Sequence, residues 1–166
     1  MNLQHENLTN ICLGTVTHKL FADDLKLYTT IQSDYDRQLL QDALVRLQQW
    51  CADWQMSINI EKCHVLNIGR NSNSNKYSIY GCELNAAQNV RDLGICVDVV
   101  LNFDAHINNI VGKAYSRIGV LYKGFASRDI SILKRAYIAY VRPILEYASS
   151  VWSPHLLKHT NAIERV

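Results

Sequence analysis

The chain has 166 residues, enough for one domain or two small ones, and 48% of them are hydrophobic while 19% are charged. This composition is typical of a globular protein and excludes a largely disordered or low-complexity chain. The charge is uneven, because residues 1–106 have a net charge of −4 and residues 107–166 have a net charge of +6. The basic part is either a solvated helical face or a surface for nucleic-acid phosphates.

The cysteines and the lengths of the apolar runs indicate in which cellular compartment we expect the protein. The five cysteines, at positions 12, 51, 63, 82 and 96, lack C-x-x-C spacing. Their odd count argues against a disulfide scaffold or a zinc ribbon and favours reduced thiols. No apolar run approaches the ~18 residues of a membrane span, and the first residues lack the basic start of a signal peptide. We therefore expect an intracellular protein, nuclear or cytoplasmic, with no membrane partner.

The first predicted element is a hairpin around two adjacent acids. Short runs with β-branched and aromatic members, residues 19–22 and 25–31, flank Asp23 and Asp24. Such runs on either side of turn-forming residues predict two strands with the acids at the tip.

A helix is predicted next, because apolar residues recur at steps of three and four from Leu39 to Trp54. Ser33 or Asp34 is its expected cap. Short β-like pieces follow, separated by Gly and Asn/Ser punctuation, which indicates small antiparallel strands. These pieces cover residues 57–60, 63–68, 77–80 and 89–100.

The period becomes helical from Asp104, with one apolar stripe up to Leu121 and another from about Asp129. Pro143 lies inside the last stripe and should kink or break the helix, because it lacks the N–H that bonds back to residue 139. Strands first and helices later predict an α+β fold with a boundary near residue 101.

The adjacent acids have two interpretations, a solvated turn or part of a divalent-metal site. Mg²⁺ takes oxygen ligands and often needs only one or two protein carboxylates beside water and phosphate oxygens. Neighbours on a straight strand point to opposite faces, so both acids can approach one ion only where the chain turns. Two-metal phosphoryl transfer needs further carboxylates, so Asp23 and Asp24 are at most part of such a site.

Five segments in a fixed order carry a resemblance to a known family. They are LFADDLKLY, LQQWCADWQMSINIEKCHVLNIG, NVRDLGICVD, AHINNIVGKAYSRIGVL and LKRAYIAYVRPILEYASSVWSPH. From about Leu20 onward the chain resembles the reverse transcriptases of non-LTR retrotransposons, above all those of jockey-type mobile elements. The resemblance implies the C-terminal part of a polymerase palm in residues 1–100, antiparallel strands with a packed helix. A truncated helical thumb would follow in residues 101–166.

The resemblance also implies catalytic roles. The first segment is similar to the family's metal-binding hairpin, in which an aromatic residue and any residue precede Asp-Asp. Asp23 would be the metal-ligating carboxylate and Asp24 its less direct partner, with Mg²⁺ (or Mn²⁺) as cofactor in a complete active site. Lys62, in the motif Asn59-x-x-Lys62-Cys63, would lie near the departing pyrophosphate as a candidate general acid. A solvated loop lysine is the alternative.

Other residues would contact nucleic acid. Leu93 and Gly94 would lie beside the primer terminus, although a core strand position is the ordinary interpretation of Leu93. Basic residues of the helical part would track the phosphates of template and primer. They are Lys113, Arg117, Lys123, Lys134 and Arg135.

The family's polymerase domain begins with fingers, a strand that bears another metal-binding Asp, and a Gly-containing helix. Here Glu6 is the only acid before Asp23, and no apolar run in residues 1–18 supplies that strand. The resemblance thus implies a fragment of an RNA-directed DNA polymerase, a nucleotidyltransferase. Its partners would be an RNA template, a DNA primer and deoxynucleoside triphosphates, and we expect it to be inactive alone. A non-catalytic nucleic-acid-binding or interaction module is the alternative.

Overall fold

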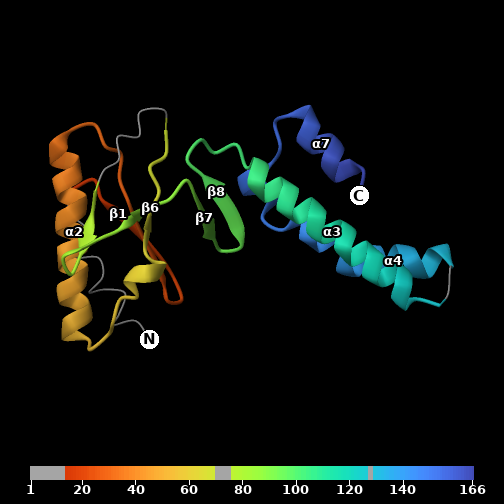
Figure 1. The fold of residues 1–166 in the computed structure, drawn as a ribbon, viewed down its shortest axis with the longest axis horizontal. Coiled ribbons are helices and arrows are strands. Elements are labelled where there is room, and N and C mark those ends of the chain that lie inside the picture. The colour runs from red at the N-terminus through yellow and green to blue at the C-terminus, as the bar shows by residue number, and fades with distance from the viewer. Residues whose placement is uncertain (1–13, 70–75, 127–128) are drawn as a thin grey trace. The chain divides into compact units, whose positions relative to one another are not determined.

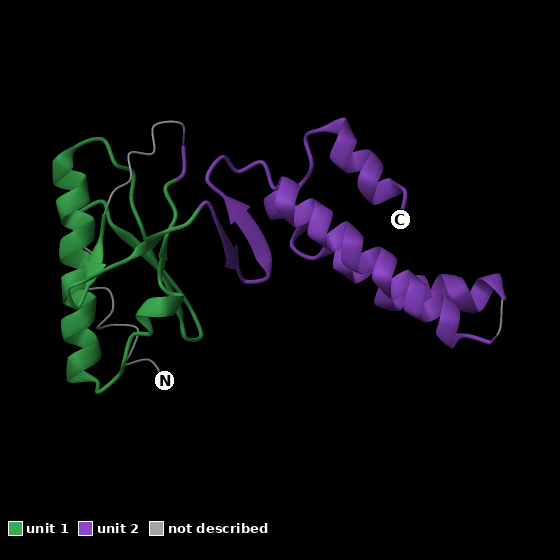
Figure 2. Ribbon diagram, viewed as in Figure 1, with its two compact units in different colours: residues 1–67, 71–87 green, residues 68–70, 88–166 purple. Residues whose placement is uncertain are grey.

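The computed structural model describes residues 14–69, 76–126 and 129–166. They fall into two compact units (Figures 1 and 2). Unit 1 is Met1–Asn67 with Asn71–Ala87, and unit 2 is Ile68–Arg70 with Gln88–Val166. Helices combine with small, mostly antiparallel sheets, in agreement with an α+β fold. The assignment of palm and thumb to residues 1–100 and 101–166 stays a prediction.

The described part of unit 1 begins with the predicted hairpin, which the structure confirms. Strand β1 (Thr17–Phe21) pairs antiparallel with β2 (Asp24–Tyr28), and the helix α2 (Asp34–Asp53) follows. One face of the hairpin packs on the apolar stripe of α2, as period-two and period-3.6 patterns require. The buried residues of this cluster are Val16, Leu39, Ala43, Leu47 and Cys51, with Leu20, Leu25 and Leu27 packed against them.

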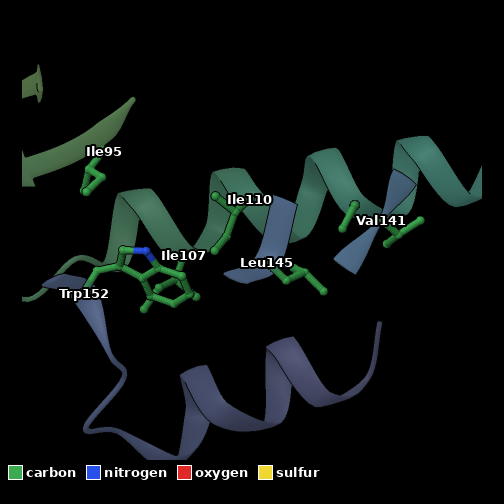
Figure 3. Packing of buried hydrophobic residues seen from close by; sticks show 7 residues of the cluster. Ile95, Ile107, Ile110, Val141, Leu145 and Trp152 are labelled. Carbon is green, nitrogen blue, oxygen red and sulfur yellow. The ribbon is translucent and has the colours of Figure 1, made fainter. Parts of the chain in front are cut away.

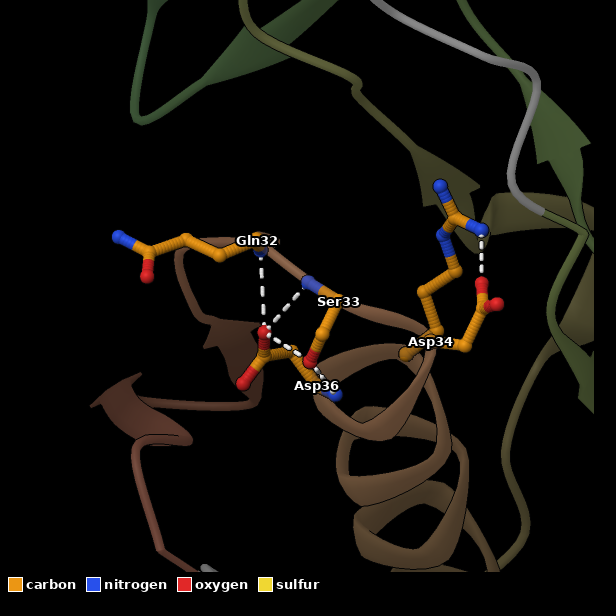
Figure 4. Close-up of polar contacts among 5 residues, drawn as sticks. Gln32, Ser33, Asp34 and Asp36 are labelled. Atoms are coloured by element: carbon orange, nitrogen blue, oxygen red, sulfur yellow. Dashed lines mark hydrogen bonds and ion pairs between the residues drawn. The ribbon is translucent and has the colours of Figure 1, made fainter.

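The start of α2 is a capping box at Ser33, one of the two predicted caps (Figure 4). The Ser33 hydroxyl accepts a hydrogen bond from the Asp36 N–H, and the Ser33 N–H donates to the Asp36 carboxylate over 2.8 Å. The Gln32 N–H donates to the same carboxylate oxygen over 3.0 Å. The Ser33 hydroxyl also donates to this oxygen over 2.8 Å, and this bond first, then those from the two backbone N–H groups, lowers the pKa of Asp36. Backbone donors at the helix start are thereby satisfied.

Two pairs of small strands complete the described part of unit 1, and a side chain of α2 holds one of these strands. Strand β4 (Ser78–Ile79) pairs antiparallel with β5 (Cys82–Glu83), while β3 (His64–Val65) pairs parallel with β6 (Asn85–Ala86). The Gln41 amide donates to the Ser78 carbonyl over 2.9 Å and accepts from the Ser78 N–H over 3.0 Å. The strand predicted at residues 57–60 is wrong, because Ile60 instead begins the 3₁₀ helix η2 (Ile60–Lys62).

Unit 2 consists of one hairpin and five helices in its described part. Strand β7 (Asn89–Asp92) pairs antiparallel with β8 (Ile95–Asp98), so the piece predicted over residues 89–100 contains a turn. The helices are α3 (Asp104–Gly124), α4 (Ile130–Tyr140), α5 (Arg142–Glu146), α6 (Ser149–Trp152) and α7 (Leu157–Glu164). No described helix has the length and apolar character that crossing a membrane requires.

The predicted break at Pro143 is confirmed. Helix α4 ends at Tyr140, and Pro143 lies in the first turn of α5, where a missing N–H costs nothing. An ion pair between Arg142 and Glu146, one turn apart, spans α5 over 2.6 Å.

The core of unit 2 lies along α3 (Figure 3). Trp152 and Ile107 meet at one end of this cluster, while Val141 packs further along α3. The buried residues are Ile95, Ile107, Ile110, Ala114, Val141, Leu145 and Trp152. Helix α7 is tied to the start of α3, because Lys158 contacts the Asp104 carboxylate over 3.0 Å and lowers the pKa of that group.

Candidate functional site

Asp23 and Asp24 lie at the tip of the first hairpin. The register pairs Phe21 with Asp24, so Ala22 and Asp23 form a two-residue turn. Asp24 and Phe21 share one face of the hairpin, opposite the face where Leu20 packs toward α2. Both carboxylates are exposed. The tip therefore exposes two acids to solvent, while the other face of the hairpin packs against α2.

Ala22 has a positive φ of 53°, a value that glycine adopts more readily than alanine. A positive φ at the first turn residue is the pattern of a type II′ hairpin, which usually has Gly there. We expect Ala22→Gly to raise the free energy of unfolding by about 0.5–1 kcal/mol. The control Ala52→Gly, on an exposed position of α2, should lower it by a similar amount. Chemical denaturation tests both variants, and destabilisation by Ala22→Gly would contradict the strained turn.

The donor chemistry at the tip suits a hard cation. Two carboxylates on adjacent residues, one in the turn and one on the strand, can contribute oxygen ligands to Mg²⁺ beside water and phosphate oxygens. Among the residues that the structure describes, no group of three or more His, Cys, Asp or Glu side chains gathers as a metal site. Asp23 and Asp24 thus fit one part of a metal centre.

Lys62 lies at the end of η2, on a turn that the surrounding motif builds. The Asn59 side chain accepts a hydrogen bond from the Lys62 N–H over 3.3 Å, and the Cys63 N–H donates to the Ile60 carbonyl over 3.0 Å. The Cys63 thiol also donates to the Asn59 carbonyl over 3.3 Å. Asn59 and Cys63 therefore fix the backbone that carries Lys62, whose side chain is exposed.

Leu93 and Gly94 form the turn of the hairpin β7–β8, and the core strand position of Leu93 is wrong. Both have positive φ, 44° and 90°, the pattern of a type I′ turn, in which Gly is preferred. Leu93 is 39% exposed, because the tight turn places it at the tip instead of on a buried face. The hairpin of unit 2 therefore exposes the two residues of its tight turn, as the hairpin of unit 1 exposes Asp23 and Asp24.

A chain of contacts that the sequence did not reveal supports this hairpin. The Tyr147 hydroxyl donates to the Leu93 carbonyl over 3.0 Å, and the Trp152 indole N–H donates to the Tyr147 carbonyl over 2.8 Å. The ring of Trp152 lies edge-on to His106, with centroids 5.3 Å apart, and His106 Nδ1 accepts from the Cys96 N–H of β8. The sequence stretches RPILEY and VWSP contain Tyr147 and Trp152 and were part of the family resemblance. The residues that they contact in the β7–β8 hairpin lie too far away in sequence to be inferred.

His106 makes this network sensitive to pH. Its pKa is lowered from 6.5, first by burial and then by the charge of Lys113, so the folded state favours the neutral ring. The unfolded chain binds the proton more tightly, so the stabilisation is complete above pH 6.5 and is lost as the pH falls below that value. We expect His106→Asn, which keeps an acceptor for Cys96 N–H, to flatten this part of the stability profile. Urea unfolding across this pH range tests it, and an unchanged slope would contradict the assignment.

The five basic residues singled out from the sequence are all exposed on two helices that contact each other. Lys113 and Arg117 lie one turn apart on α3, with Lys123 in its last turn, while Lys134 and Arg135 are adjacent on α4. Exposed cations on packed helices can contact successive phosphates without a base-specific pocket.

Comparison with known proteins gives three matches along most of the chain. The RNA-directed DNA polymerase from the mobile element jockey of Drosophila melanogaster is 27% identical over 96% of this chain, and its Drosophila funebris counterpart is 27% identical over 94%. A probable RNA-directed DNA polymerase from transposon BS of Drosophila melanogaster is 26% identical over 87%. No family model matches the chain, and no solved structure matches it.

The chain is related to jockey-type reverse transcriptases. The agreement of three such polymerases over nearly the same residues decides this relationship, because each alignment runs through both units. The chain corresponds to 18%, 18% and 17% of the length of these relatives, so it spans less than a fifth of each. The jockey relationship therefore covers both hairpins and the basic helices.

Proposed function

We propose that the chain carries one part of the metal site and the template–primer-binding helices of a jockey-type RNA-directed DNA polymerase. The observation that supports this most strongly is the tight turn that displays Asp23 and Asp24, in a chain similar to a jockey polymerase over 96% of its length. Asp23 would hold Mg²⁺, with Asp24 beside it, and Mn²⁺ has the same preference for oxygen ligands. When bound, the metal would stabilise negative charge on the reacting phosphate oxygens.

The other residues would position the substrates. Lys62, fixed by the Asn59 turn, would face the triphosphate of the incoming nucleotide. Leu93 and Gly94 would contact the primer near its 3′ end, and the exposed cations of α3 and α4 would hold the phosphates of an RNA template and a DNA primer. The net positive charge of residues 107–166 supports a phosphate-binding role for the helices of unit 2.

We expect the 166-residue chain alone to lack template-directed synthesis. The tip offers two carboxylates, whereas placement of two metal ions about 4 Å apart needs more ligands. A primer-extension assay with Mg²⁺ and all four deoxynucleotides checks this, with Asp53→Ala as a control for an exposed acid elsewhere in unit 1. Extension that Asp23→Ala abolishes and Asp53→Ala preserves would contradict the expected inactivity.

A second candidate function is a nucleic-acid-binding module without catalysis, which the exposed cations of α3 and α4 favour. In that case binding to an RNA–DNA hybrid falls steeply with salt but does not respond to Asp23→Ala. Binding that strengthens with Mg²⁺ and loses this response in Asp23→Ala instead favours the polymerase site.

A further inference from the structure

The turn Leu93–Gly94 belongs to a hairpin that needs support from outside. Two strands alone are marginally stable in water, and β7–β8 pairs only with itself among the described strands. Strand β8 is anchored just after the turn, because Ile95 is buried and the Cys96 N–H donates to His106 over 3.3 Å. These anchors lie on β8, on one side of the turn, whereas the Leu93 carbonyl on the other side is held by a separate contact.

Tyr147 makes that contact in two ways. Its hydroxyl donates to the Leu93 carbonyl over 3.0 Å, and its ring borders Gly94, where an added Cβ would lie 3.4 Å from Tyr147 Cε1. The bond joins residues 54 positions apart in the sequence. The positive φ of the turn therefore favours Gly94, and the Tyr147 ring lies within van der Waals reach of it.

The backbone of Tyr147 is itself held on both sides. Its N–H donates to the Pro143 carbonyl over 3.1 Å at the end of α5, and its carbonyl accepts from the indole of buried Trp152 over 2.8 Å. Tyr147 is therefore a fixed point from which one side chain reaches the turn, although the residue as a whole is 58% exposed.

We propose that Tyr147 is a positioning residue that holds the Leu93–Gly94 turn for the 3′ end of a nucleic-acid primer, an inference that rests on the proposed function. The residue acts through the turn, so its loss should change how the chain distinguishes duplex ends rather than how tightly it binds phosphates. Tyr147→Phe removes the hydroxyl and keeps the ring. Tyr115→Phe is the matched control, because the Tyr115 hydroxyl also donates to a backbone carbonyl, that of Arg165, over 3.2 Å.

The test measures binding of the whole chain to an RNA–DNA hybrid with a recessed DNA 3′ end and to the same hybrid with blunt ends. We expect the wild type and Tyr115→Phe to prefer the recessed end, and Tyr147→Phe to reduce that preference about threefold with blunt-end affinity unchanged. Gly94→Ala, which strains the positive φ of the same turn, should reduce the preference as well.

Each other outcome overturns a defined part of the account. A preference that survives Tyr147→Phe, or that falls equally in Tyr115→Phe, overturns the role of Tyr147. Wild-type binding without any preference for the recessed end overturns this inference and leaves the phosphate-binding helices intact. Absence of binding to either hybrid overturns the proposed function together with the inference.

Discussion

Trp152→Ala is expected to lower the free energy of unfolding of unit 2 by about 4 kcal/mol. Trp152 is 3% exposed, packs in the cluster along α3, lies edge-on to His106 and donates its indole N–H to the Tyr147 carbonyl. Its removal leaves a cavity and an unpaired carbonyl, so the transfer, packing and hydrogen-bond contributions are lost together. Helical circular dichroism during guanidinium unfolding is the measurement.

Trp54→Ala is the control for this prediction. Trp54 is 42% exposed at the end of α2, where its ring centroid lies 6.2 Å from that of Trp50. Loss of this partial contact should cost about 1 kcal/mol in unit 1. A loss of stability in Trp152→Ala no larger than in Trp54→Ala would contradict the proposed core of unit 2.

Joint replacement of the exposed cations on α3 and α4 by glutamine is expected to weaken hybrid binding by on the order of 100-fold. The replaced residues are Lys113, Arg117, Lys123, Lys134 and Arg135. Each neutralised phosphate contact contributes about 0.9 to the slope of log affinity against log salt, so the loss of five contacts should reduce the magnitude of the slope by about 4.5. Fluorescence anisotropy over a salt series measures both quantities.

A variant of Lys19, Arg46 and Lys76, three exposed cations of unit 1, tests whether the effect depends on location. Its slope should change by less than about 1, because these residues lie outside the proposed phosphate-binding helices. An equal change for each charge removed in the two variants would mean that net charge alone attracts the hybrid.

Local chemistry made part of the fold predictable. The hairpin of Asp23 and Asp24 follows from two apolar runs around turn residues, and the start of α2 follows from a capping residue. The end of α4 before Pro143 follows from a missing N–H and its steric conflict. Each of these features depends on residues within a few positions of one another.

Features set by distant partners could not be read in the same way. The piece predicted at residues 77–80 contains the strand β4, but the local pattern does not show that Gln41, 37 positions away, holds this strand. Leu93 looks like a strand residue, and only the paired register places it in a turn. The contribution of Tyr147 arises from a hydrogen bond across 54 positions, which neither composition nor periodicity encodes.

The central claim is that the tip of the first hairpin is part of a metal site. The most direct test adds Mn²⁺ to the isotope-labelled chain bound to a recessed RNA–DNA hybrid and records paramagnetic broadening of the backbone amide signals. The account predicts broadening centred on Ala22, Asp23 and Asp24 that disappears in Asp23→Asn and persists in Asp53→Asn. Broadening that is absent from this tip, or that is unchanged in Asp23→Asn, would contradict it.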